Sequence, residues 1–326
     1  MKNFQLVRAS TTASAVATIA KDPTARFIAG GTNLIDLMKK RVAEPDKLID
    51  ITGLDLKKIE QLDGKIRIGA LAKNSHVAED KLIIKKHPLL ALALAAGASQ
   101  QIRNMATVGG NMLQRTRCPY FYNTDMPCNK RQPGSGCGAR EGFNRMHAIF
   151  GASDKCIAVH PSDMCIALAA LDAVVHVEGP KGSRQIPFAG FHRLPGDMPE
   201  KDNTLEYNEL ITAIEIPDND FNDNVHYLKV RDRSSYAFAL VSVAAALDIK
   251  GGKVIDARLA LGGVAHKPWR LLEAENDLKG KPATNENFKQ AAQLAMQGAK
   301  GYGQNNFKLT LTPNSIVEAL AIAASK

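Results

Sequence analysis

The sequence predicts a mixed α+β/α/β protein in two parts, a larger domain over residues 1–217 and a small α+β domain over 225–326. In the larger part, short apolar strand patterns alternate with helical patterns, and 326 residues are enough for two or three domains. In the smaller part, strand patterns come first and helix patterns last, which is typical of an α+β domain. The polar, turn-rich segment PDNDFNDN at 217–224 predicts the boundary.

The chain begins with a strand, a helix and a glycine turn. Residues 3–8 have a strand pattern, and Thr11–Ala20 has a helical pattern capped by one of its two initial threonines. The apolar segment RFIA at 26–29 then runs into Gly30-Gly31-Thr32-Asn33 and the helical pattern LIDLMKKR. A strand, a glycine turn and a helix can present free backbone N–H groups to a phosphate. A plain turn is the alternative, because the segment is neither GxGxxG nor a Walker loop.

The rest of the larger part continues the alternation. Strand patterns cover 47–51, 65–71, 173–178, 184–188 and 210–216, and helix patterns cover 74–80, 88–99 and 162–170. A second glycine pair, Gly109-Gly110, stands between Thr107 and Asn111. Two such turns could hold two parts of one elongated ligand, so together they carry more weight than either does alone.

The smaller part has three strand patterns followed by three helix patterns. The strands are expected at 227–230, 240–249 and 254–261, and the helices at 268–275, 285–297 and 313–324. Lys250-Gly251-Gly252-Lys253 predicts a hairpin between the last two strands. The helices are expected to pack on the resulting sheet.

All five cysteines lie within 60 residues, at the spacings C-x9-C, C-x8-C, C-x18-C and C-x8-C. No CxxC pair occurs, so the spacing does not match a zinc ribbon or a thioredoxin-like motif. Thiolates tethered by one loop (114–159) could still converge on an iron–sulfur cluster, and disulfides or unlinked thiols are the alternatives. Cys165 differs from the others because it lies in the apolar helical pattern SDMCIALAALDA, which predicts a buried, structural thiol.

The composition, with 45% hydrophobic and 23% charged residues, is ordinary for a globular protein, and the net charge is +9. The basic clusters are short and lack interleaved aromatic residues, which argues against nucleic acid and fits an anionic cofactor or an acidic partner. No apolar run reaches the ~18 residues of a membrane span, and MKNFQLVR lacks the apolar core of a signal peptide. We therefore expect a cytoplasmic protein, or a periplasmic one co-exported with a signal-bearing partner.

Three polar residues each have an ordinary and a functional interpretation. Asp163 is placed to favour the first turn of a helix capped by Ser162, or to contact a ligand hydroxyl. His160 is either a hydrogen-bonded structural histidine or part of a ligand site. Lys229 is either a solvated lysine on a strand or a ligand contact. No nucleophile elbow, zinc helix or kinase signature occurs, and no residue is predicted to be catalytic.

Five motifs in order carry a resemblance to a known family: FIAGGTNLIDLMK, QIRNMATVGGN, PSDM, ELITAIEIP and LKVRDRSSYAFALVSVAAAL. Over nearly the whole chain, the sequence resembles the FAD-binding (medium) subunits of the molybdenum hydroxylases, the family of xanthine dehydrogenase, aldehyde oxidoreductase and carbon monoxide dehydrogenase. The resemblance implies a two-part FAD-binding domain of the vanillyl-alcohol-oxidase type, with subdomains at about 1–55 and 56–217. It also implies a C-terminal domain of the CO dehydrogenase flavoprotein type at 225–326.

The segment RCPYFYNTDMPCNKRQPGSGCGA is similar to an insert in one branch of that family, the periplasmic aromatic aldehyde oxidoreductases. The similarity implies a 4Fe–4S cluster held by Cys118, Cys128, Cys137 and Cys156, with Cys165 as the spare thiol. The hydroxybenzoyl-CoA reductases carry a related insert, so they remain an alternative. Both a relay role and a structural role for the cluster remain open.

The resemblance also implies the FAD contacts. These are Arg26, Phe27, Ile28, Ala29, Gly30, Gly31, Thr32, Asn33 and Leu34 around the pyrophosphate, Thr107, Gly110 and Asn111 as a second clamp, and Asp163, Ile211 and Lys229 along the rest of the cofactor. The implied function is an electron-transfer subunit of a heterotrimeric molybdenum-dependent aldehyde oxidoreductase, with a large molybdopterin subunit and a small 2Fe–2S subunit. The alternatives are a xanthine dehydrogenase or hydroxybenzoyl-CoA reductase complex, a self-sufficient flavin oxidase, and a non-enzymatic metal or thiol sensor.

Overall fold

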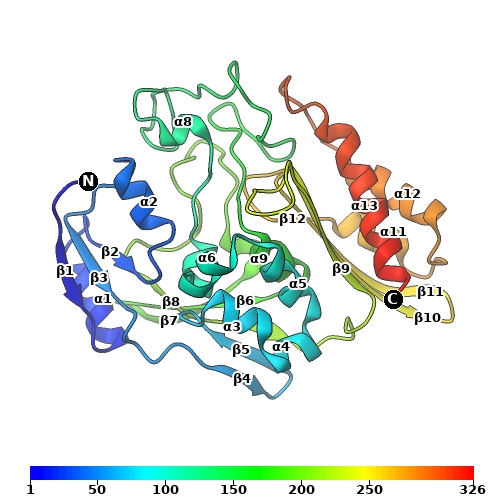
Figure 1. The fold of residues 1–326 in the computed structure, drawn as a ribbon, viewed down its shortest axis with the longest axis horizontal. Coiled ribbons are helices and arrows are strands. Elements are labelled where there is room, and N and C mark those ends of the chain that lie inside the picture. The colour runs from blue at the N-terminus through cyan, green and yellow to red at the C-terminus, as the bar shows by residue number, and fades with distance from the viewer.

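The computed structural model describes residues 1–326 and contains three β-sheets (Figure 1). The first sheet is parallel, with the order β1 (Gln5–Arg8), β3 (Lys47–Asp50), β2 (Arg26–Ile28). Helix α1 (Thr12–Ala20) connects β1 to β2, and Thr11 caps it in a reciprocal capping box with Ser14. Helix α2 (Leu34–Lys39) follows β2 after the first glycine turn.

The second sheet has five antiparallel strands in the order β4-β5-β8-β6-β7. These are β4 (Ile59–Leu62), β5 (Lys65–Gly69), β8 (Leu210–Pro217), β6 (Val174–Gly179) and β7 (Gly182–Pro187). Alternate residues of β6 are buried, as expected for a strand with one face on the core. Helices α3 (Asn74–Glu79), α5 (Pro88–Ala96) and α9 (Asp163–Ala170) contribute to the same core of 36 buried residues.

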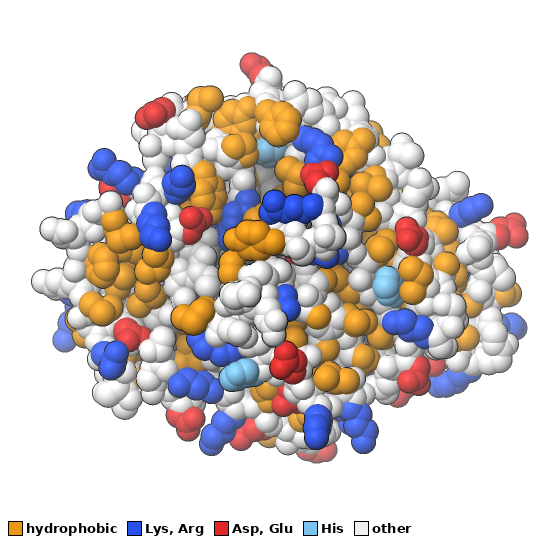
Figure 2. All heavy atoms as spheres, in the orientation of Figure 1, with side chains coloured by type: hydrophobic (Ala, Val, Ile, Leu, Met, Phe, Trp, Pro, Cys, Tyr) orange, Lys and Arg blue, Asp and Glu red, His pale blue; other side chains and the backbone are white.

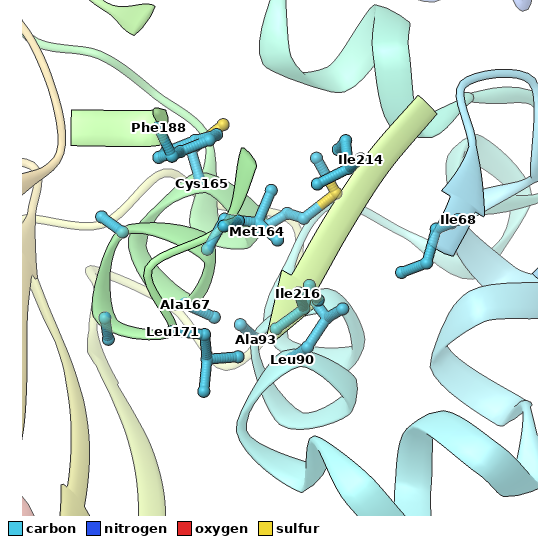
Figure 3. Close-up of a cluster of buried hydrophobic side chains, with 14 of the residues drawn as sticks. Ile68, Leu90, Ala93, Met164, Cys165, Ala167, Leu171, Phe188, Ile214 and Ile216 are labelled. Carbon is cyan, nitrogen blue, oxygen red and sulfur yellow. The ribbon is translucent and has the colours of Figure 1, made fainter. Parts of the chain in front are cut away.

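Helix α9 is buried along its whole length, which explains its lack of a polar face. Figure 3 shows Met164 of this helix extending toward Ile214, and Cys165 beside Phe188. Cys165 has 0% exposure, so the prediction that this thiol is buried is confirmed.

The C-terminal sheet is antiparallel, with the order β12-β11-β10-β9. Its strands are β9 (Val225–Val230), β10 (Val241–Lys250), β11 (Lys253–Gly262) and β12 (Trp269–Arg270), and helices α11 (Leu272–Leu278), α12 (Asn285–Ala295) and α13 (Lys308–Ala324) share a separate core with it. Gly251 and Gly252 both have positive φ, 58° and 76°, so the predicted tight hairpin is confirmed.

Two helix predictions in this domain have the wrong N-terminal boundary. The helix predicted from 268 begins at Leu272, because Trp269 and Arg270 pair with β11 instead. The helix predicted from Pro313 begins at Lys308, so the proline lies inside it. Proline is favoured in the first turn of a helix, but tertiary packing of α13 extends the helix past that point.

One strand and several short helices have no clear sequence pattern and were not predicted. They are β4, α4 (Lys81–Lys86), α6 (Gln100–Met105), α7 (Val108–Met112), α8 (Pro119–Tyr122) and α10 (Phe188–Phe191). The long cysteine loop contains only α8, and Figure 1 shows this loop at the top of the molecule, between α2 and the C-terminal helices. No helix combines the length and the hydropathy that crossing a bilayer requires.

Candidate functional site

A cleft of about 680 Å³ lies between the two glycine turns, α5 and the segment after β9. Six of the residues predicted to bind a cofactor line it: Thr32, Asn33, Gly110, Asn111, Asp163 and Lys229. The structure therefore brings the two glycine turns to one cavity, although about 75 residues separate them in the sequence. The predicted contacts that do not line it are Arg26, Phe27, Ile28, Ala29, Gly30, Gly31, Leu34, Thr107 and Ile211.

The first glycine turn is packed tightly against the segment that precedes the second. A Cβ atom on Gly30 would lie 2.0 Å from the carbonyl oxygen of Met105, so no larger residue fits without a backbone shift. Gly31 has a φ of 72°, a conformation that glycine adopts at little cost. The side-chain oxygen of Asn33 accepts a hydrogen bond from the backbone N–H of Arg115 at 2.9 Å. The close packing and the hydrogen bond hold the first glycine turn in its conformation.

The second glycine turn forms the start of a short helix. Thr107 caps α7 by accepting a hydrogen bond from the backbone N–H of Gly110 at 3.3 Å. The side-chain oxygen of Asn111 accepts from the Ser162 hydroxyl at 2.8 Å, which ties this turn to the start of α9. Thr107 itself is buried, so it supports the cleft wall rather than lining it.

Three buried polar atoms of the cleft residues have no hydrogen-bond partner in the protein. They are Asn33 Nδ2, Asn74 Oδ1 and the Tyr122 hydroxyl, and this hydroxyl lies close enough to Asp36 and Asn33 for both residues to shift the pKa of Tyr122. A buried polar group without a hydrogen-bond partner destabilises the folded protein by about 1–3 kcal/mol. A polar ligand that bonds to such a group would remove this penalty. The donor and acceptor chemistry of this wall therefore fits a ligand with hydroxyl, amide and phosphate groups, as FAD has.

Basic side chains outnumber acidic ones on the cleft wall. Arg103, Arg117, Lys229 and Arg233 line it, against Asp36, Asp163 and Asp232. Burial lowers the pKa of Arg117, which is therefore a strongly desolvated cation that an anionic ligand would stabilise. Over the face seen in Figure 2, basic side chains are interspersed with acidic and hydrophobic ones. The excess of positive charge at the cleft suits a diphosphate.

Asp163 and Lys229 form a buried ion pair at the cleft. Lys229 Nζ lies 2.8 Å from one carboxylate oxygen of Asp163, and the Tyr227 hydroxyl donates to the other oxygen at 2.8 Å. Lys229 also donates to the carbonyl oxygen of Ala96 at 3.1 Å. Burial raises the pKa of Asp163, and the lysine opposes this shift. The ordinary reading of Lys229 as a solvated lysine is thus wrong, because its side chain is only 4% exposed.

Two of the residues outside the cleft have other partners. Ile211 is 4% exposed in the main core and pairs with Val177 across β8 and β6. The Arg26 guanidinium donates to the carbonyl oxygens of Pro23 and Ala25 at 2.9 and 2.6 Å. Neither residue lines the cleft. The predicted contacts of Ile211 and Arg26 with the cofactor stay predictions.

Four cysteines from the long loop line one small chamber, defined here by Cys118, Cys128, Cys137 and Cys156 together with Tyr120, Phe121, Lys130 and His147. Cys128 and Cys137 also face each other in an isolated antiparallel bridge. All five cysteines are free thiols, so the disulfide alternative has no support in the structure.

The spacing of the chamber sulfurs does not match a single tetrahedral zinc ion. Tetrahedral zinc, with Zn–S bonds of about 2.3 Å, would need sulfurs about 3.8 Å apart. No three of the four sulfurs lie within 4.8 Å of one another. The four thiols therefore do not form the compact group that a single tetrahedral ion needs, and the cluster at these cysteines stays a prediction.

Burial makes two of the chamber thiols, Cys118 and Cys156, weaker acids. It raises the pKa of Cys118 to about 12 and that of Cys156 to about 11. The positive charge of a metal centre would stabilise the thiolates that the protein alone disfavours. The chamber also holds hydrogen-bond donors for sulfur: His147 Nε2 lies 3.1 Å from Cys118 Sγ, and the backbone N–H of Ala158 lies 3.5 Å from Cys156 Sγ.

A buried ion-pair network closes the chamber on one side. Lys130, with a side chain only 1% exposed, bonds to Asp202 and donates to the carbonyl oxygen of Pro199 at 2.7 Å. Arg115 Nε bonds to the other oxygen of Asp202 at 2.6 Å. Burial alone would raise the pKa of Asp202, but Lys130 and Arg115 outweigh it and hold that pKa well below its usual range. The loop is thus anchored to the larger domain.

A third cavity of about 130 Å³, the passage, lies between the cleft and the chamber. It shares Arg117, Met146, Pro161, Asp163 and Phe238 with the cleft, and Thr116, Cys118 and His147 with the chamber. The passage therefore shares wall residues with both predicted sites, which lie close together.

His160 lines the passage and is buried. Its Nε2 atom has no hydrogen-bond partner in the protein, and both interpretations of His160 stay predictions. Its side chain lies with those of Cys165 and His192, whose possible ligand atoms are all within 4.8 Å of one another. Cys165 is thus separate from the chamber, as its sequence context predicts.

Sequence reasoning missed several residues of these sites. Asn74, Arg117 and Tyr122 line the cleft, and Lys130 and His147 line the chamber. The last four lie in or beside the cysteine loop, so their closeness to the cysteines in sequence was a usable indication. Asn74 begins a predicted helix and gave none.

The fold and the cleft together define a class, a two-domain protein that binds an elongated, anionic nucleotide cofactor. Residues 2–219 match the family described as the FAD binding domain in molybdopterin dehydrogenase, and residues 226–322 match the CO dehydrogenase flavoprotein C-terminal domain. The chain therefore belongs to the FAD-binding medium subunits of the molybdenum hydroxylase family, whose members are subunits of oxidoreductase complexes.

Individual relatives agree with this assignment. The chain is 47% identical to the aldehyde oxidoreductase FAD-binding subunit PaoB of Escherichia coli (strain K12), over 100% of both chains. It is 30% identical to the glyceraldehyde dehydrogenase medium chain of Sulfolobus acidocaldarius, over 89% of this chain and 85% of that one. A chain of carbon monoxide dehydrogenase from Hydrogenophaga pseudoflava has the same fold, with a TM-score of 0.78, 26% identity, and coverage of 99% of this chain and 98% of that one.

Proposed function

We propose that this chain is the FAD- and iron–sulfur-containing electron-transfer subunit of a molybdenum-dependent aldehyde oxidoreductase. Its partners are a large molybdopterin-binding subunit and a small 2Fe–2S subunit, and it passes their electrons to an external acceptor. Redox chemistry of this kind belongs to the flavin, while the protein binds, orients and tunes it. In this proposal, FAD binds in the cleft and the iron–sulfur cluster binds in the chamber.

In this proposal, the two glycine turns hold the diphosphate of FAD. Thr32, Asn33, Gly110 and Asn111 line the cleft and supply backbone and side-chain donors. Asn33 Nδ2 and the Tyr122 hydroxyl gain partners from the cofactor. Asp163, held by Lys229 and Tyr227, keeps a carboxylate oriented at the wall for a cofactor hydroxyl. The tight packing behind Gly30 keeps this wall in place.

The four chamber cysteines hold a 4Fe–4S cluster in the same proposal. The observation that carries this part is that all four predicted ligands, spread over 39 residues of loop, line one buried chamber while the fifth cysteine lies elsewhere. Four thiolates are the usual ligand set of such a cluster.

The identities to the relatives support the aldehyde class of substrate. The chain is 47% identical to an aldehyde oxidoreductase subunit along its whole length, against 25% to the xanthine dehydrogenase FAD-binding subunit of Escherichia coli O157:H7. A cleft and a chamber in one chain also favour a flavin subunit over a thiol sensor, because a sensor needs no second cavity lined by unpartnered polar atoms.

Purification of the native complex tests the proposal. We expect three kinds of subunit by mass spectrometry, one FAD and about four iron atoms on this chain, and bleaching of the flavin absorbance when an aromatic aldehyde is added without oxygen. A folded chain that takes up FAD but no iron would remove the cluster from the proposal. A chain that purifies alone and takes up no FAD would overturn it entirely.

A further inference from the structure

His147 lies in the wall between the chamber and the passage. It is 3% exposed, and it lines both cavities. Its partner Cys118 is the one chamber cysteine that also lines the passage. The pair of His147 and Cys118, 3.1 Å apart from Nε2 to Sγ, therefore lies where the walls of the chamber and the passage coincide.

The chemistry of sulfur fixes the direction of this hydrogen bond. A cysteine that ligates iron is a thiolate and has no proton to donate. His147 must then carry its proton on Nε2 and donate it to Cys118. The other ring nitrogen, Nδ1, is buried and has no partner in the protein, so no second hydrogen bond competes for the orientation of the ring.

Resting on the proposed function, we infer that His147 is a positioning residue that raises the reduction potential of the cluster through its hydrogen bond to Cys118. A hydrogen bond to a thiolate ligand stabilises the reduced cluster, which carries more negative charge, more than the oxidised one. The buried cation of Lys130 and the backbone N–H of Ala158 act in the same direction. The chamber is thus built for a centre that is readily reduced.

The His147 side chain can be changed without removing the anchors of its backbone. The carbonyl oxygen of His147 accepts hydrogen bonds from Lys308 Nζ at 3.0 Å and from Asn305 Nδ2 at 3.3 Å. Cys118 is the single hydrogen-bond partner of the ring. A substitution here therefore tests the bond to sulfur separately from the fold of the loop.

The test is a redox titration of the whole complex, followed by electron paramagnetic resonance, after iron and FAD have been quantified. In His147→Leu, the ratio of reduced to oxidised cluster at a fixed potential should fall about tenfold, which is a midpoint about 59 mV lower for one electron. His147→Gln keeps an amide N–H donor and should recover most of the shift. His226→Leu, on β9 and away from the chamber, is the control and should match the wild type.

The outcomes separate this inference from the proposal beneath it. A wild-type chain without iron overturns the cluster itself. A cluster-bearing wild type with an unchanged midpoint in His147→Leu overturns only the role of His147. If the leucine variant does not assemble the cluster, His147→Asn takes its place, since its shorter amide cannot reach Cys118 from the same backbone position. An unchanged midpoint in that variant would count equally against the inference.

Discussion

The cleft and the chamber are adjacent, but they are built in different ways. Glycine turns and the ends of short helices form much of the cleft wall, and local hydrogen bonds such as Thr107 to Gly110 shape it. The chamber is formed by side chains of a loop with little regular structure. That loop is held by distant residues, among them Asp202 in the larger domain and Asn305 and Lys308 before and within α13.

The cleft and the chamber also differ in whether the protein alone can form the site before the cofactor binds. Backbone hydrogen bonds and one buried ion pair within the protein stabilise the cleft wall. The wall can therefore form before its ligand binds. The chamber contains thiols whose protonation burial favours, so a metal centre must supply the charge that stabilises its working form. We therefore expect substitutions in the chamber to affect iron without FAD, and substitutions in the cleft to affect FAD first.

The largest effect is expected from Cys137→Ser. This cysteine is partly exposed, so the change removes one predicted ligand with little cost to packing. Iron should fall from about four atoms per chain to a small fraction of that, while the FAD content stays at the wild-type level. Atomic absorption and flavin absorbance measure the two. Cys165→Ala is the matched control, and a loss of iron there as complete as in Cys137→Ser would show that the chamber is not the site.

The next largest effect is expected from Asp163→Ala. The change leaves Lys229 Nζ buried with the carbonyl oxygen of Ala96 as its one remaining hydrogen-bond acceptor. Breaking a buried ion pair by removing one partner costs about 3–5 kcal/mol, so the urea midpoint should fall and FAD should be lost on dilution. In the double variant Asp163→Ala, Lys229→Met, no unpaired charge remains, and much of the stability should return. A double variant no more stable than the single one would contradict the role given to this pair.

A smaller effect is expected from Gly30→Ala. The new Cβ would meet the carbonyl oxygen of Met105 at 2.0 Å, and backbone atoms cannot move away as a side chain can. The turn must shift, and we expect FAD to bind roughly 10- to 100-fold more weakly, a loss of about 1–3 kcal/mol. Fluorescence titration of the apoprotein with FAD measures this. Gly190→Ala, where nothing lies within 4 Å of the new atom, should bind FAD normally.

All four predicted cysteines line the chamber, whereas six of the fifteen predicted cofactor contacts line the cleft. Glycine turns follow from local backbone chemistry, so Gly30, Gly31 and Gly110 could be recognised without the fold. Most strands and most long helices were also predicted correctly, because hydrophobic periods of 2 and 3.6 residues reveal them. Short helices such as α7 and α8 escaped, since one or two turns carry too little periodicity.

The chamber depends on contacts between distant parts of the chain. The resemblance implied its four cysteines, but nothing in the sequence pairs His147 with Cys118 or Lys130 with Asp202, which lie 29 and 72 residues apart. The same limit explains Lys229. A lysine on a strand is usually solvated, and the opposing carboxylate of Asp163, 66 residues away, is invisible until the fold brings the two together.

The smallest effect concerns Lys308, which supports the chamber from α13. Its Nζ atom is fully buried and donates to the carbonyl oxygens of His147 and Gly263 at 3.0 and 2.7 Å. Burial lowers the pKa of Lys308 to about 7, against an ordinary 10.5. Between these values the unfolded chain binds one more proton than the folded chain does. The contribution of Lys308 to the free energy of unfolding should therefore rise with pH above about 7.

The buried thiols act in the opposite direction, because their raised pKa values make the folded state lose stability as the pH rises past the ordinary range of cysteine. The wild type alone would mix the two effects, so the comparison is with Lys308→Met, which keeps the thiols. Between about pH 7.5 and 8.5, urea unfolding should show the wild type gaining up to about 1.4 kcal/mol relative to the variant. If the free energies of unfolding of the two proteins change with pH in parallel, Lys308 stays charged in the folded state. The group that bonds to the backbone of the chamber would then be an ammonium group paired only with carbonyl oxygens.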